Sequence, residues 1–121
     1  MAQEKRSYFT NVDASPREMA SAADATISMG LKSYSIYNPN TSDVFAKFYD
    51  ETSGIVTVGT TDPHYGEILV PAQSQVVLAN GTQSEPLRTF NNYITCAATT
   101  TRGGSTSPTS DVEVEIIYWG G

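Results

Sequence analysis

The sequence is poor in the residue types that most often carry chemistry. It holds one cysteine, Cys96, and one histidine, His64. A single cysteine excludes an intramolecular disulfide and a thiolate metal cluster, and the strand-like neighbours of Cys96 predict a small buried apolar residue. A single histidine without partners at usable spacing does not make a catalytic triad or a zinc site. We therefore expect no enzymatic activity, no metal and no other cofactor.

Basic residues and long apolar runs are also scarce. Seven lysines and arginines stand against 13 acidic residues, which gives a formal net charge of −6. An acidic surface repels phosphate, so a nucleic acid is not an expected partner. No apolar stretch approaches the roughly 18 residues of a membrane-spanning helix, and the N-terminus has no apolar segment of the kind found in signal peptides. We expect no membrane partner and synthesis in a cytoplasm.

The acidic residues do not form a recognisable catalytic or metal-binding pattern. Glu113 and Glu115 are two positions apart in a strand-like run, so they share a face. Their apolar neighbours predict that this is a solvated outer face of a sheet, and not a pair of catalytic acids in a cleft. No Asp-x-Asp-x-Asp calcium loop is present. Other acidic residues lie in predicted turns: Asp43, Asp50, Glu51 and Asp62.

Alternation of polar and apolar residues is the main positive signal. The closing run, residues 111–119, has the two-residue period of a strand. Two earlier runs, 26–37 and 43–50, read as strands joined into a hairpin by the turn at 38–42. Further short strands are expected at 55–58, 67–70, 75–79 and 93–98.

This spacing predicts an all-β protein. Seven or eight short antiparallel strands separated by polar turns are typical of a single β-sandwich or jelly-roll-like domain, here over residues 27–121. In the run 26–37, the period places Leu31 and Tyr37 on one face and Tyr34 and Ile36 on the other.

Residues 1–26 are predicted to be an extended N-terminal arm. Ser15, Pro16 and Glu18 have the spacing of a helix cap, a first helical residue and a capping box, which predicts a short helix over 16–23. So short a helix is marginal alone, and an arm of this kind is either disordered or ordered by a partner. We expect a partner, because linkers seldom carry large apolar side chains such as Tyr8, Phe9 and Met19. The candidate partner-binding residues are its larger apolar side chains: Tyr8, Phe9, Val12 and Met19.

The aromatic residues permit two interpretations. Seven tyrosines, four phenylalanines and one tryptophan serve packing in the core and at interfaces in most proteins. Gathered on one exposed sheet face, they would instead form a platform on which sugars stack. The pattern leaves open on which side Tyr34, Tyr37 and Tyr49 lie.

A series of short segments resembles a known group of proteins. In their order along the chain, over about residues 30–119, they resemble the small β-sandwich modules of virion structural proteins of tailed bacteriophages. Such modules serve as capsid decoration (cement) proteins or as parts of head and tail fibres. The segments are 37–49, 58–63, 68–72, 97–101 and 112–118.

The resemblance implies a structural protein of the capsid surface that bridges subunits of the major capsid protein. It also implies self-association, as a homotrimer or, next, a dimer. The alternative is a fibre or host-recognition module that binds surface glycans through aromatic residues and the loops 59–66 and 99–110. No catalytic residue and no cofactor come with the resemblance.

Overall fold

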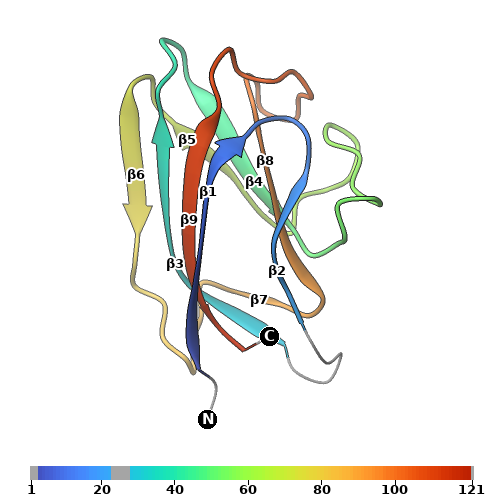
Figure 1. The fold of residues 1–121 in the computed structure, drawn as a ribbon, viewed down its shortest axis with the longest axis vertical. Coiled ribbons are helices and arrows are strands. Elements are labelled where there is room, and N and C mark those ends of the chain that lie inside the picture. Colours follow the sequence, from blue (N-terminus) through green and yellow to red (C-terminus); the bar gives the residue numbers. More distant parts are fainter. Residues whose placement is uncertain (1–2, 23–27, 121) are drawn as a thin grey trace.

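The computed structural model describes residues 3–22 and 28–120, and these residues form an all-β fold (Figure 1). No helix within them is long and apolar enough to cross a membrane. The strands are β1 (Glu4–Val12), β2 (Arg17–Ser21), β3 (Met29–Asn38), β4 (Val44–Tyr49), β5 (Tyr65–Val70), β6 (Ser74–Leu78), β7 (Arg88–Phe90), β8 (Tyr93–Thr99) and β9 (Val112–Trp119).

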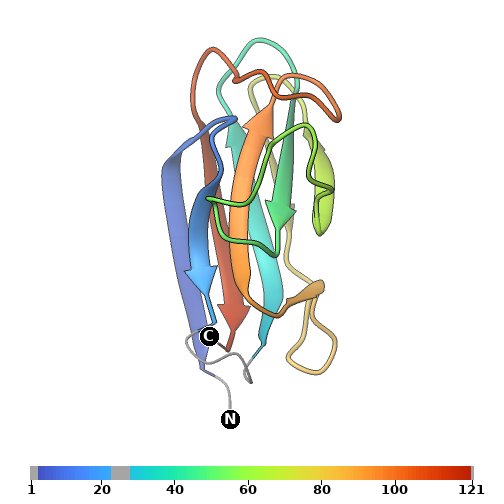
Figure 2. The same cartoon turned by 90° about the vertical axis from the view of Figure 1, so that its right-hand side faces the viewer.

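The strands make two antiparallel sheets that pack face to face (Figures 1 and 2). The first sheet has the order β1-β9-β3-β6, with the short β7 also on β3, and the second has the order β2-β8-β4-β5. The pairs are nested: β4 with β5, β3 with β6, β2 with β8, and β1 with β9. This connectivity is a jelly roll, which confirms the predicted β-sandwich.

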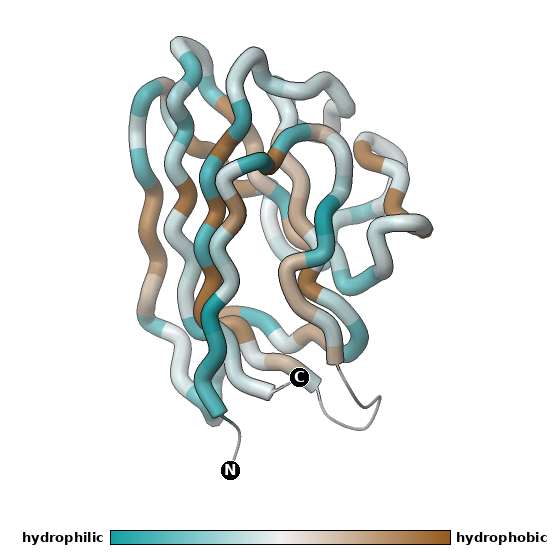
Figure 3. Tube along the Cα trace, viewed as in Figure 1, coloured by the Kyte–Doolittle hydropathy of each residue, from teal (hydrophilic) through white to brown (hydrophobic). Residues whose placement is uncertain are grey.

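Strand β9 lies between β1 and β3 and shows the alternation that its sequence predicts. Val112, Val114 and Ile116 are fully buried between the sheets, whereas Glu113 and Glu115 point to the outer face. In Figure 3 the first part of the strand alternates between hydrophobic and hydrophilic colours. The predicted solvated face of the two glutamates is confirmed.

The core consists of the inward side chains of both sheets. Each such side chain, when fully buried, contributes on the order of 1.5–3 kcal/mol. The larger buried members are Val12, Met19, Met29, Leu31, Tyr34, Ile36, Val44, Phe48, Val70, Phe90, Ile94, Val112, Val114 and Ile116.

The N-terminal segment is part of the sandwich, which corrects the prediction of an arm with a helix over 16–23. Strand β1 pairs with β9 and strand β2 pairs with β8. Residues 17–21 are extended because pairing with β8 satisfies their backbone and buries Met19 and Ala20. Residue 23 and the expected boundary between residues 26 and 27 lie outside the described residues.

Two further predictions were wrong. The turn at 38–42 does not close a hairpin, because β3 belongs to the first sheet and β4 to the second. Residues 55–58 are not a strand but part of the loop between β4 and β5. That loop lies over the outer face of the second sheet (Figure 2), where Val56 packs on Tyr49 and Ala97.

A buried asparagine ties together the loops at one end of the sandwich. Asn38 is fully buried, and its side-chain nitrogen donates hydrogen bonds to the carbonyl oxygens of Ser42 (2.9 Å), Val70 (3.1 Å) and Pro71 (3.2 Å). Its side-chain oxygen accepts from the backbone and side-chain nitrogens of Asn40, both at 2.9 Å. One side chain thus joins the β3–β4 and β5–β6 connections.

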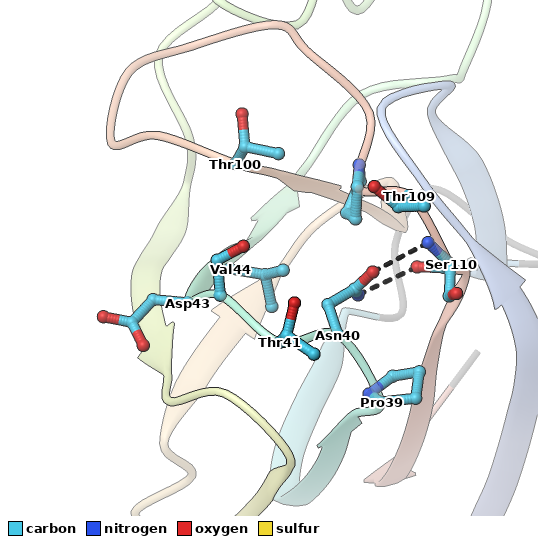
Figure 4. A pocket seen from close by; sticks show the side chains of 10 residues that line it. Pro39, Asn40, Thr41, Asp43, Val44, Thr100, Thr109 and Ser110 are labelled. Atoms are coloured by element: carbon cyan, nitrogen blue, oxygen red, sulfur yellow. Dashed lines mark hydrogen bonds between the residues drawn. The ribbon is translucent and has the colours of Figure 1, made fainter.

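Asn40 extends this network to the β8–β9 connection. Its side-chain nitrogen donates to the carbonyl of Ser110 at 3.0 Å, and its side-chain oxygen accepts from the amide of Ser110 at 2.7 Å (Figure 4). A polar cavity of about 210 Å³ opens beside this pair, bordered by Thr41, Asp43 and Thr109 among others. The hydrogen bonds of Asn40 hold the β3–β4 and β8–β9 connections at a fixed separation.

A buried ion pair between strands β4 and β5 holds the β8–β9 connection against the second sheet. The Lys47 ammonium, 2% exposed, lies 2.7 Å from a Glu67 oxygen, and the Gly103 amide donates to both Glu67 oxygens at 2.9 Å. Burial alone would raise the pKa of Glu67. Hydrogen bonds from Lys47 and Gly103, with the positive charges of Lys47 and Arg102, outweigh that effect and lower this pKa.

The Asn38 network predicts a large loss of stability when it is removed. Asn38→Ala leaves several buried backbone groups without partners, so we expect the free energy of unfolding to fall by about 2–4 kcal/mol. The exposed Asn80 provides the matched control, since Asn80→Ala should change stability by less than about 0.5 kcal/mol. Urea denaturation measures both variants. Equal midpoints for the two would contradict the assignment.

The ion pair predicts a pH-dependent stability difference. Glu67→Gln leaves the buried Lys47 ammonium without a counter-charge and should cost about 3 kcal/mol at pH 7. Because the folded pKa of Glu67 is lowered, its contribution is complete above its ordinary pKa and is lost as pH falls through the folded value. The difference from wild type should therefore shrink in acid. Urea titrations at several pH values test this, with the exposed Glu85→Gln as control.

Candidate functional site

The structure separates the four residues that the sequence predicted to bind a partner. Tyr8 lies on β1 with its side chain on the outer face of the first sheet, and it is 49% exposed. Phe9 is partly buried and packs against the core. Val12 and Met19 are core residues, so a partner does not reach them in this fold. Partner binding by Tyr8 and Phe9 stays a prediction.

Tyr8 belongs to a polar and aromatic surface on the outer face of the first sheet, which we call the tyrosine face. It surrounds an open depression of about 360 Å³. Its residues come from all four main strands of that sheet. They are Arg6, Tyr8, Ser35, Tyr37, Gln75, Glu113 and Glu115.

The strand register brings these residues together. Tyr8 lies opposite Glu115, which lies opposite Ser35 on its other side. One step further along the sheet, Glu113 lies opposite Tyr37. Directly opposite residues on one sheet face have Cβ atoms about 5 Å apart. Each glutamate of β9 therefore has a tyrosine as its cross-strand neighbour.

On the β1 side of the face, the charges are matched. The Arg6 Nε atom donates to Glu115 Oε2 at 2.7 Å, and the same guanidinium forms a salt bridge with that carboxylate. The guanidinium carbon is 5.8 Å from the centre of the Tyr8 ring, a distance at which a cation is attracted to an aromatic face. Arg6, Glu115 and Tyr8 thus form one interacting group.

On the β3 side, the glutamate is bound by a hydroxyl group. The Tyr8 hydroxyl donates to Glu113 Oε1 at 2.5 Å, and this hydrogen bond is the main reason that the pKa of Tyr8 is raised. Among the described residues, no lysine, arginine or histidine forms an ion pair with Glu113. Its cross-strand neighbour Tyr37 is 39% exposed. Beside it, the Gln75 amide donates to the Ser35 hydroxyl at 2.7 Å.

The lone histidine and the lone cysteine serve packing. The Nε2–H group of His64 donates to the Thr89 carbonyl at 2.7 Å, and its ring packs edge-on against Phe90. Cys96 is buried between the sheets, and burial raises the pKa of its thiol to about 12. The prediction of a small buried residue at Cys96 is confirmed.

Two of the turn carboxylates stabilise backbone turns. The two oxygens of Asp50 accept three hydrogen bonds from the amides of residues 91–93. An Asp43 oxygen accepts from the Ala72 amide at 3.1 Å. Among the described residues, no three side chains of histidine, cysteine, aspartate or glutamate gather as a metal site would require.

The structure places the three tyrosines whose side the sequence did not determine, Tyr34, Tyr37 and Tyr49. Tyr34 packs in the core against Phe48 and Tyr65. Tyr49 is buried under the β4–β5 loop, where its hydroxyl has no hydrogen-bond partner among the residues that the structure describes. Only Tyr37 joins Tyr8 on an exposed face. Alternation in the sequence does not determine which of these three side chains is exposed, and it does not show which tyrosines lie next to one another.

Comparisons with known proteins add little to the assignment of a family or a function. No family model matches the sequence, and no curated protein matches it. One similar solved structure is a chain of the cyanophage Pam1 capsid asymmetric unit. It is 13% identical, with a TM-score of 0.37, and the match covers 99% of this chain and 86% of that chain. A likeness at this TM-score assigns neither a family nor a function.

The exposure of the two tyrosines predicts that they can be changed without loss of the fold. In the variant Tyr8→Thr with Tyr37→Thr, threonine keeps the preference for strands, so stability should change by less than about 1 kcal/mol. The buried Tyr34→Ala should instead cost about 3 kcal/mol or more. Urea denaturation compares the three proteins, and a double variant as unstable as Tyr34→Ala would show that the face is structural.

Proposed function

We propose that this chain is a non-enzymatic structural protein of a tailed-phage virion, which decorates the capsid surface and bridges subunits of the major capsid protein. The observation that carries the proposal is the tyrosine face. It is an open, four-stranded sheet surface with two exposed tyrosines and a glutamate, Glu113, that has no cation in the described part of the chain. Tyrosine is enriched at binding hot spots between proteins.

The two outer faces of the sandwich differ in a way that selects the docking surface. The β4–β5 loop covers part of the second sheet, where Val56 and Val58 pack in one cluster with Tyr49 and Ala97. Among the described residues, no loop covers the tyrosine face of the first sheet, where Tyr8 and Tyr37 are exposed. We therefore place the contact with the major capsid protein on the first sheet.

The architecture is consistent with this role. Jelly rolls occur in viral capsid domains, and also in lectins and cupins, so the fold by itself does not choose among them. The sequence segments that resemble modules of phage virion proteins, taken in their order, support a capsid domain over a lectin or a cupin. A stable contact needs about 1,000 Å² or more of buried surface, and repetition over a shell adds avidity. On the same resemblance we propose self-association as a trimer, with a dimer as the next choice.

The surroundings of four titratable side chains also support binding over reaction. Glu67 is held by Lys47, Asp50 caps a turn, and His64 and Cys96 are engaged in packing. Each of these groups is used to hold the fold. We infer that the tyrosine face works as a contact surface and not as part of a catalytic set.

The proposal predicts the behaviour of particles. Shells assembled from the major capsid protein of the same genome should carry this chain after sedimentation. The variant Tyr8→Thr with Tyr37→Thr should reduce its occupancy at limiting concentration by about tenfold or more, because exposed tyrosines at an interface contribute strongly to affinity. Ile55→Thr, which changes an exposed apolar residue on the β4–β5 loop, is the control and should bind as wild type.

Two results would contradict the proposal in different ways. Full occupancy by the double variant would show that the tyrosine face is not the docking surface. Absence of the wild-type chain from particles would reject capsid decoration. Saturable binding of an oligosaccharide on a glycan array, lost in Tyr37→Thr, would then favour the second candidate, a fibre or host-recognition module that binds glycans. The exposed tyrosines, Tyr8 and Tyr37, are the observation that favours this second candidate, because sugars stack on exposed aromatic rings.

A further inference from the structure

Each half of the tyrosine face carries a tyrosine and a glutamate, but among the described residues only the β1 half also has a cation that binds its glutamate. On the β1 side, a tyrosine and a glutamate are joined by a guanidinium, since Arg6 contacts both Glu115 and the ring of Tyr8. On the β3 side, Tyr37 and Glu113 stand opposite each other, and no cation of the described residues forms an ion pair with that glutamate.

We propose that Tyr37 and Glu113 form a slot for a guanidinium group from a partner protein, which completes the second half as Arg6 completes the first. This inference rests on the proposed function, because it names the chemistry by which the docking surface recognises the major capsid protein. The partner surface accordingly presents at least one arginine to the middle of the tyrosine face.

The position of Glu113 suits this role. Its Oε1 atom accepts the hydrogen bond of the Tyr8 hydroxyl, which orients the carboxylate and leaves Oε2 for another donor. A guanidinium has planar N–H groups that match a carboxylate edge, and it also stacks on an aromatic ring. Both requirements are met side by side, because Tyr37 is the cross-strand neighbour of Glu113 and its ring is partly exposed.

Arg6, the arginine of the tyrosine face, does not fill the slot. Both Nε and Nη2 of Arg6 are directed to Glu115. The acidic balance of the whole chain, a net charge of −6, would also favour the approach of a basic surface. A neutral sugar would gain hydrogen bonds and stacking here, but it would leave the charge of Glu113 uncompensated.

The test is an NMR titration of the full chain with two short peptides. The probe is acetyl-Gly-Arg-Gly-amide, and the matched peptide carries citrulline, which has nearly the same shape without the charge. The arginine peptide should shift the amide signals of Tyr37 and Glu113 saturably, and the citrulline peptide should bind at least about fivefold more weakly. Glu113→Gln should weaken arginine binding to a similar extent, while Glu85→Gln removes an exposed charge elsewhere and should leave it unchanged.

Several outcomes would overturn the inference. They are no saturable shift, equal binding of the two peptides, or unchanged binding by Glu113→Gln. Shifts of the same amides by an oligosaccharide, without any by the arginine peptide, would assign the slot to glycans. Particle occupancy separates the two proposals. If the wild-type chain decorates particles and Glu113→Gln does so equally, only the guanidinium slot fails, whereas peptide binding without decoration would sink the proposed function alone.

Discussion

The insertion of β9 between β1 and β3 is the constraint on which the rest of the structure depends. The last strand of the chain pairs with the first on one side and with β3 on the other. It supplies Val112, Val114 and Ile116 to the core and both glutamates to the tyrosine face. Tyr8 and Glu113 meet across 105 positions of sequence, so the face forms only when the outermost pair of the nested strands has closed.

Buried polar contacts determine which outer surface stays open. The Lys47–Glu67 pair and the Gly103 amide hold the β8–β9 connection against the second sheet, and the β4–β5 loop packs over that sheet through its own small apolar cluster. Buried polar groups are stable only when they are paired, so these contacts allow few alternative loop positions. These contacts cover the part of the second sheet around Tyr49 and Ala97, whereas Tyr8 and Tyr37 on the first sheet stay exposed.

The local sequence predicts strands well where polar and apolar residues alternate and no helix signal is present. It fails where a local preference, such as a helix start, is outweighed by pairing with a distant strand. Residues 111–119 alternate cleanly, and the orientation of Glu113 and Glu115 follows from that alone. Residues 15–18 have good helix-start chemistry, yet pairing with β8 and burial of Met19 outweigh that preference. Leu31 was predicted to share a face with Tyr37, but a register shift between residues 31 and 33 turns it into the core.

The candidate site shows the same limit, because its composition depends on register. A slip of β1 by two residues would keep every side chain on its side of the sheet, but it would move Arg6 relative to the glutamates of β9. The irregularity between Phe9 and Val12, and the burial of Val12 opposite Val112, oppose such a slip. Val12 was expected to touch a partner directly. In the structure it lies in the core. There it helps to hold the register in which the Arg6 side chain forms its ion pair with Glu115 and not with Glu113.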